Sequence, residues 1–77
     1  MNPYENLANA IVVKAAEDYR GSLRVLRRHP DDRNALIEQR RLEDFFRSGW
    51  FGTLTNLDGS MLMRKIKSDT RQMEGIA

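Results

Sequence analysis

Residues 45–51 read Phe-Phe-Arg-Ser-Gly-Trp-Phe and hold four of the six aromatic side chains of this 77-residue chain. A chain of this length buries only a small core, and large rings are needed to fill it. Neighbouring residues of an α-helix point about 100° apart, so adjacent rings cannot all enter one narrow seam between helices. We therefore expect most of these rings in the core and at least one on the surface, with Trp50 as the candidate.

A long helix is predicted over residues 3–28, upstream of the aromatic segment. Asn2 suits the N-cap and Pro3 the first helical position, while Pro30 disfavours helical geometry at His29 and ends the helix. Apolar residues recur at intervals of three and four and draw one stripe along this helix, formed by Tyr4, Leu7, Ala8, Ile11, Val12, Ala15, Tyr19, Leu23 and Leu26. Such a stripe packs against a neighbouring helix.

The turn at residues 29–32 predicts a second helix, antiparallel to the first. Pro30 suits a first helical turn, and Asp31 and Asp32 face the positive end of the helix dipole. A shorter apolar stripe follows, formed by Ala35, Leu36, Leu42, Phe45, Phe46 and Gly49.

Two interpretations are possible for the chain beyond this helix. Ser48-Gly49 kinks or ends it, and the apolar spacing carries helical character on to Asn56. Asp58 then suits the N-cap of a third helix, which contains Met61, Leu62 and Ile66 and exposes Arg64, Lys65 and Lys67. The alternative is a β-hairpin that turns at Asp58-Gly59 and pairs residues 50–55 with 60–66. The second of these segments lacks clean alternation and is rich in helix formers, so helices are predicted for both.

The sequence thus predicts an all-α fold, a small bundle made of a long antiparallel helical hairpin plus one or two shorter C-terminal helices. A single helical domain covers residues 1–67, and the polar residues 68–77, which have no strong period, form a frayed tail. The chain has no cysteine and no apolar run long enough to cross a bilayer. We expect a cytoplasmic protein without membrane contact.

The residue types that carry catalysis are scarce. His29 is the only histidine, and neither a nucleophile nor an orienting partner is visible beside it in the sequence. Because it lies beside a proline at a helix end, His29 is predicted to be a capping or turn residue. Asp31 and Asp32 are explained by capping, without a metal. The sequence therefore predicts no catalytic residue, no metal site and no cofactor, and a protein that is not an enzyme.

Binding to a partner is the favoured activity. The chain has ten arginines and three lysines, and guanidinium groups bind carboxylates or phosphates at two points and stack on rings. Trp50 is the preferred anchor, because tryptophan and arginine are enriched among binding hot spots. The predicted partner-binding residues are Trp50, Phe51 and Arg47, with a second group at the end of the first helix, Arg20, Arg24, Arg27 and Arg28. The other interpretation of that group is a solvated face that complements the helix dipole and pairs with Glu17 or Asp31.

Two further activities stay open. Residues 56–67 can be read as part of a helix-turn-helix motif that binds nucleic acid through Arg64, Lys65 and Lys67, and the arginines offer phosphate contacts. The start of that helix lacks short polar side chains that read bases, so the match is weak. The thin core and the long amphipathic first helix also suit a self-associating module, such as a homodimer.

Several segments resemble small proteins encoded by bacteriophages and prophages, mostly without an assigned role. These segments are Ala8-Asn9-Ala10-Ile11-Val12-Val13, Asp18-Tyr19-Arg20, Phe45-Phe46-Arg47-Ser48-x-Trp50-Phe51 and Leu54-Thr55-x-Leu57-Asp58-Gly59, within about residues 6 to 67. Phage accessory proteins of this size often inhibit host defence, as anti-CRISPR proteins do, or regulate transcription. Many anti-CRISPR proteins imitate DNA with dense negative charge, whereas this chain has a formal charge of +2. The resemblance therefore implies an inhibitor that occupies a protein surface, or a protein-nucleic acid junction, of a host defence effector.

Overall fold

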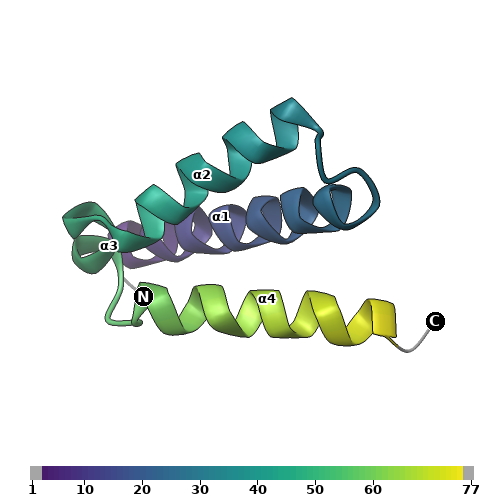
Figure 1. The fold of residues 1–77 in the computed structure, drawn as a ribbon. Coiled ribbons are helices and arrows are strands. Elements are labelled where there is room, and N and C mark those ends of the chain that lie inside the picture. Colours follow the sequence, from purple (N-terminus) through teal and green to yellow (C-terminus); the bar gives the residue numbers. More distant parts are fainter. Residues whose placement is uncertain (1–2, 76–77) are drawn as a thin grey trace.

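The computed structural model describes residues 3–75, which form four helices. They are α1 (Pro3–Arg28), α2 (Arg33–Arg47), α3 (Gly49–Leu54) and α4 (Gly59–Gly75), shown in Figure 1. The all-α prediction is confirmed. The β-hairpin alternative is wrong, because α3 and α4 occupy the segments that it assigned to strands, and residues 3–75 contain no strand.

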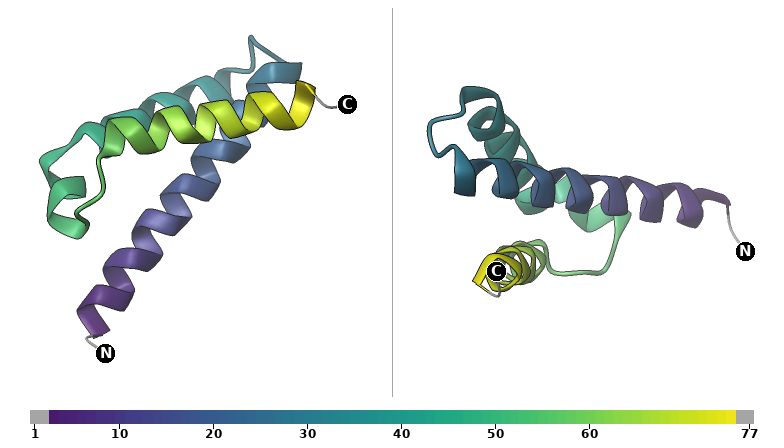
Figure 2. Two further views of the ribbon diagram at one scale, coloured as in Figure 1. Left: turned by 90° about the horizontal axis from the view of Figure 1, so that it is seen from below. Right: turned by 90° about the vertical axis from the view of Figure 1, so that its right-hand side faces the viewer.

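α1 is the element against which the other three helices pack. The chain reverses at residues 29–32, and α2 runs back obliquely across α1 (Figure 1). α3 turns at the far end of α2, and α4 then returns toward the α1–α2 turn and contacts both α1 and α2 (Figure 2). The result is an elongated bundle of 40 × 26 × 19 Å, with α3 at one end and the α1–α2 turn at the other.

Asp58 sets the start of α4. Its Oδ1 accepts the backbone N–H groups of Ser60 at 2.9 Å and of Met61 at 3.2 Å, which satisfies two of the donors that a helix start leaves unpaired. The predicted cap is confirmed. Asn2, the cap predicted for α1, lies outside the described residues.

The second helix begins later than predicted. Asp32 is its N-cap, since its carboxylate accepts the N–H of Ala35 at 2.9 Å. Pro30 and Asp31 therefore lie in the turn before α2, and their placement in the first helical turn is wrong. The His29 carbonyl accepts the N–H of Asp32 at 3.0 Å and closes this turn.

Ser48 forms the joint between α2 and α3. Its hydroxyl donates to the Phe45 carbonyl at 2.6 Å, which ends α2, and accepts the N–H of Phe51 at 3.2 Å, which caps α3. The chain therefore changes direction within one residue. This joint brings the ring of Phe51 back onto the rings of α2.

The core lies where the four helices meet, and its buried side chains are Val12, Ala15, Tyr19, Phe46, Phe51, Met63 and Ile66. The α1 stripe is confirmed from Val12 to Leu23, which packs against this cluster. It fails at the N-terminal end, where Leu7 is 60% exposed. The side chain of Tyr4 lies outside the described part of the structure.

The α2 stripe is narrower than predicted. Ala35 and Phe46 are buried, whereas Leu36 is exposed. Leu36 follows Ala35 directly and so points about 100° away from it, and only one of the two can face the core. Gly49 is also exposed, because α2 has ended before it and it begins α3.

α4 continues through residues 68–75, a stretch for which the sequence predicted a frayed tail. Thr70 is buried within this stretch, and its hydroxyl donates to the Ile66 carbonyl at 2.9 Å. A threonine satisfied in this way continues the buried stripe of Met63 and Ile66. Thr70 therefore interrupts the apolar pattern of the sequence at a position where the helix continues.

A close backbone contact joins α2 to α4 at Gly59. This residue is buried, and a methyl group placed on it would overlap the Phe46 carbonyl.

We expect Gly59→Ala to lower the free energy of unfolding by about 2 kcal/mol, the usual scale for an overpacked site. Urea denaturation followed by circular dichroism measures this change.

Gly21→Ala is the matched control, since Gly21 is an exposed helical residue with nothing near its missing side chain. It is expected to raise the free energy of unfolding by about 0.5–1 kcal/mol, because alanine is the better helix former. Equal stability of the two variants would contradict the contact at Gly59.

Candidate functional site

The rings of the aromatic segment divide between core and surface. Phe46 packs against Tyr19 and Phe51 with ring centroids 5.5 Å apart in each pair, and Phe45 lies 5.6 Å from Phe51. Trp50, in contrast, is 59% exposed. The expectation that one ring faces outward is confirmed, and that ring is Trp50. Phe51, which was predicted to bind a partner, is only 2% exposed and belongs to the core, so it is not part of this surface.

Trp50 does not stand alone at its end of the molecule. Leu57, in the α3–α4 connection, is 57% exposed, and Met61, in the first turn of α4, is 62% exposed. α3, this connection and the start of α4 lie together at one end of the bundle (Figure 1). We call Trp50, Leu57 and Met61 the apolar end.

The predicted arginines lie in two places. Arg47, the last residue of α2, is next to α3, and its guanidinium is 4.0 Å from the Glu43 carboxylate. Arg24, Arg27 and Arg28 are exposed in the last turns of α1, near the opposite end, and Arg20 is half-buried between the two ends. The structure therefore does not bring the α1 arginines together with Trp50.

A polar network crosses the middle of the bundle. The Tyr19 hydroxyl on α1 donates to Glu43 Oε2 on α2 at 2.7 Å, and Lys67 Nζ on α4 lies 3.5 Å from the same oxygen. Gln39 Nε2 donates to that oxygen as well, at 3.3 Å. One carboxylate thus links three helices.

The network shifts the pKa of both of its acidic groups. Burial and the hydrogen bond to Glu43 raise the pKa of Tyr19 above its ordinary value. Burial favours the neutral form of Glu43, but the Tyr19 hydrogen bond, Lys67 and Arg47 outweigh it, and the pKa of Glu43 is lowered. Glu43 is therefore ionised at neutral pH.

Sequence analysis missed this network. It placed Tyr19 in the apolar stripe of the first helix and assigned no role to Glu43. The Tyr19 hydroxyl could have indicated that a polar partner is present, because a buried tyrosine hydroxyl needs a hydrogen-bond partner. Nothing in the spacing of the sequence indicates that Glu43, 24 residues away, supplies it.

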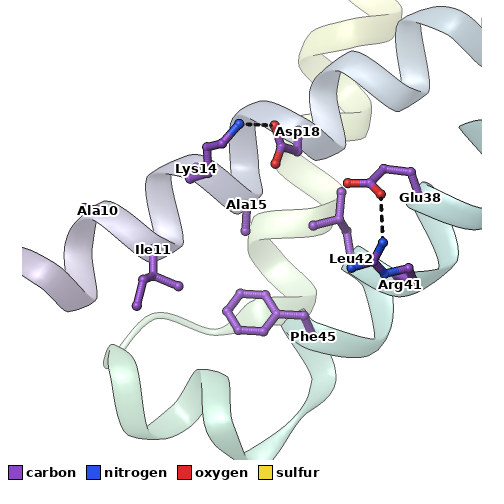
Figure 3. Close-up of a pocket in the computed structure, with 9 residues that line it drawn as sticks. All are labelled: Ala10, Ile11, Lys14, Ala15, Asp18, Glu38, Arg41, Leu42 and Phe45. Carbon is purple, nitrogen blue, oxygen red and sulfur yellow. Dashed lines mark hydrogen bonds and ion pairs between the residues drawn. The ribbon is translucent and has the colours of Figure 1, made fainter.

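An open groove of about 490 Å³ runs between α1 and α2 (Figure 3). Ile11, Leu42 and Phe45 give it an apolar floor. Its rim carries two ion pairs within single helices, Lys14 with Asp18 at 2.9 Å on α1 and Arg41 with Glu38 at 3.6 Å on α2. Each cation of the rim is neutralised by a neighbouring carboxylate, so the groove has no preference for charge.

His29 and the carboxylates are the other side chains that were considered for catalysis or metal binding. His29 is exposed in the α1–α2 turn. Among the side chains that the structure describes, no three of the types that bind metal ions come together.

Two general findings complete the description. Within residues 3–75, no helix combines the length and the apolar character that a membrane crossing requires. Comparisons of the chain with protein-family models, with curated proteins and with solved structures gave no match.

The network makes a prediction for stability against pH. Glu43→Gln is expected to lower the free energy of unfolding at neutral pH by about 1–2 kcal/mol, because Tyr19 and Lys67 lose an ionised acceptor. The pKa of Glu43 is lower in the folded chain than its unfolded value of 4.5, so ionised Glu43 stabilises the fold above that pH. This contribution is lost as the pH falls through the folded pKa. The difference between wild type and variant should therefore shrink below about pH 4.5, as measured by chemical denaturation at a series of pH values.

Glu38→Gln removes the same charge from the exposed face of the same helix. It is expected to change the free energy of unfolding by less than about 0.5 kcal/mol, the usual scale for an exposed ion pair. A difference between wild type and Glu43→Gln that stays constant with pH would contradict the role given to Glu43.

Proposed function

We propose that the chain is a non-enzymatic, phage- or prophage-encoded binding protein that inhibits a host defence effector, in the manner of an anti-CRISPR protein, in the bacterial cytoplasm. The proposed binding activity depends on one observation. Trp50 is exposed, whereas the other rings of its segment lie in the core or pack against it. The resemblance to small phage proteins supplies the class of target.

The apolar end has the composition of an interface anchor. Trp50, Leu57 and Met61 are each more than half exposed, whereas 77 residues offer few large apolar side chains for the core. Removing such side chains from water stabilises a complex, and tryptophan is the residue type most enriched among hot spots. The apolar end is therefore the surface where a partner gains most by binding.

Packing explains why Trp50 is available. Ser48 fixes the direction of α3, and Phe51, which it caps, fills the core against Phe46. Trp50 precedes Phe51 by one residue on the same short helix and so points about 100° away from it. Its outward direction follows from the position of Phe51.

The size of the molecule limits which arginines share this interface. A standard interface covers about 800 Å² of each partner, a patch about 30 Å across. The bundle is 40 Å long, so a patch centred on Trp50 includes Arg47 but ends before the last turn of α1. Arg47 belongs to the proposed site, while Arg24, Arg27 and Arg28 require a second contact.

Charge indicates how the inhibitor acts. The formal charge of +2 does not imitate a nucleic-acid duplex, and Trp50, Leu57 and Met61 are themselves uncharged, although the exposed Asp58 lies next to Leu57 in the sequence. Contact with a protein surface of the effector, through Trp50 and its neighbours, accounts for both facts.

Trp50→Ala tests the site. With RNA-guided nucleases of bacterial hosts as targets, wild-type protein is expected to block cleavage of target DNA. The variant should need about 30-fold more protein for the same effect, which corresponds to about 2 kcal/mol for a hot-spot residue. Its thermal unfolding should match that of the wild type, because the ring is exposed.

Ile37→Ala is the control, because Ile37 is 53% exposed but lies on α2, outside the apolar end. It should inhibit as the wild type does. Unaffected cleavage across a broad panel of effectors would contradict the inhibitor function, whereas full inhibition by Trp50→Ala would contradict only the site.

Nucleic-acid binding is the rival function, since Arg64, Lys65 and Lys67 are exposed on α4 as predicted. Two of these three cations are already engaged, Lys65 with Asp69 at 3.2 Å and Lys67 with Glu43 at 3.5 Å. Gel shifts with duplex DNA and with RNA at low salt distinguish the two functions. No retardation is expected, and retardation that falls steeply with salt would favour the rival.

A further inference from the structure

A second stripe of residues runs along α1, beside the stripe that enters the core. Its members recur at alternating intervals of four and three, which is the spacing of a helix that pairs with another helix along its length. Each member is exposed or half-buried. We call this set the outer stripe, and it consists of Leu7, Ile11, Lys14, Asp18, Gly21 and Val25.

The outer stripe is apolar toward its two ends. Leu7 is 60% exposed and Val25 is 39% exposed. Ile11 is half-buried and belongs to the floor of the groove between α1 and α2, which Lys14 and Asp18 also line (Figure 3). The outer stripe and the open groove are therefore parts of one surface.

This surface is complementary to itself when a second copy of the chain lies antiparallel to it. A two-fold axis at the level of Ala16 places residues that are equally far from Ala16, on opposite sides, against each other. Leu7 then meets the partner's Val25, and Ile11 meets the partner's Gly21. Gly21 leaves room for this contact, because a side chain added there would meet no other described atom within 4 Å.

The same axis places Lys14 against the partner's Asp18 and Asp18 against the partner's Lys14. Both side chains reach solvent, with 73% of Lys14 and 36% of Asp18 exposed. Within one chain, Lys14 Nζ donates to Asp18 Oδ1 at 2.9 Å, and an ammonium group has further donors for a second carboxylate. The four groups of the two copies thus form a ring of alternating charge. A parallel arrangement would instead place like charges together.

We propose that the chain forms an antiparallel, two-fold symmetric dimer with a second copy of itself through the outer stripe of α1. The groove gives the partner's α1 further apolar contact with Leu42 and Phe45 of α2. From Leu7 to Val25 the stripe extends over about 27 Å at the usual rise of a helix. An interface on this scale is at the small end of the known range, so a weak and reversible dimer is expected. Because the proposal does not involve the apolar end, it is independent of the proposed function.

Charge reversal across the axis tests the arrangement. Sedimentation velocity over about a hundredfold range of protein concentration should show that the wild-type chain dimerises as the concentration rises. Lys14→Glu and Asp18→Lys should each weaken the dimer at least about tenfold, because each substitution brings like charges together across the axis.

An equimolar mixture of these two variants is the decisive sample. In the mixed dimer, the new carboxylate of one chain meets the new ammonium of the other, and the unchanged Asp18 meets the unchanged Lys14. Association should therefore return. Glu17→Lys is the control for Asp18→Lys, because it makes the same change of charge at the adjacent residue, which is exposed and lies outside the outer stripe. It should dimerise as the wild type does.

Val25→Ala tests the apolar contacts separately. It should weaken the dimer about tenfold, because the symmetric interface loses the same methyl groups twice. Val13→Ala is the matched control, since Val13 is a 54% exposed valine on the same helix and lies outside the outer stripe. It should leave the dimer unchanged, and circular dichroism checks that every variant keeps its helix content.

The proposal is overturned if the wild type stays monomeric over the whole range of concentration. It is also overturned if the mixture associates no better than either charge variant alone, or if Val13→Ala and Val25→Ala weaken the dimer equally. Trp50→Ala should dimerise as the wild type does, and loss of association in this variant would place the contact between copies at the apolar end instead. Sedimentation requires no effector, so its outcome is separate from that of the cleavage assays.

Discussion

The Ser48 hydroxyl determines the arrangement of the aromatic segment. By donating to Phe45 and accepting from Phe51, it ends one helix and starts the next without a loop between them. Phe51 then completes the core against Phe46, and Trp50 is left in water. The proposed binding surface therefore arises from the same hydrogen bonds that close the core.

α4 is held to the rest of the bundle by two different contacts. At its first turn, Gly59 allows the backbones of α4 and α2 to touch at Phe46. Near its middle, Lys67 reaches the carboxylate that also holds Tyr19. Apolar packing alone tolerates sliding of one helix along another. The contact at Gly59, which fits only glycine, and the carboxylate shared by Tyr19 and Lys67 each favour one position of α4 along the bundle.

Local features of the fold could be predicted from the sequence, and long-range ones could not. The extent of α1, the Asp58 cap and the change at Ser48 depend on residues within a few positions of each other, and local chemistry determines them. The start of α2 was misjudged because Pro30 also suits a first helical turn, whereas the Asp32 carboxylate accepts the N–H of Ala35 and makes Arg33 the first helical residue. The length of α4 was underestimated because Thr70 looks polar in the sequence and satisfies its hydroxyl within the helix. For the site, the aromatic segment has more rings than one seam between helices can hold, and this predicted an exposed ring. The separation of Trp50 from the α1 arginines depends on how the helices pack, and the sequence did not predict it.

Trp50 is the only tryptophan of the chain, and its indole lies in solvent at the apolar end. Intrinsic fluorescence excited at the indole band therefore comes from one known position on the surface. Transfer of this indole from water to an apolar contact moves its emission to shorter wavelength. The molecule thus carries its own optical reporter for any docking event at that end, without a label.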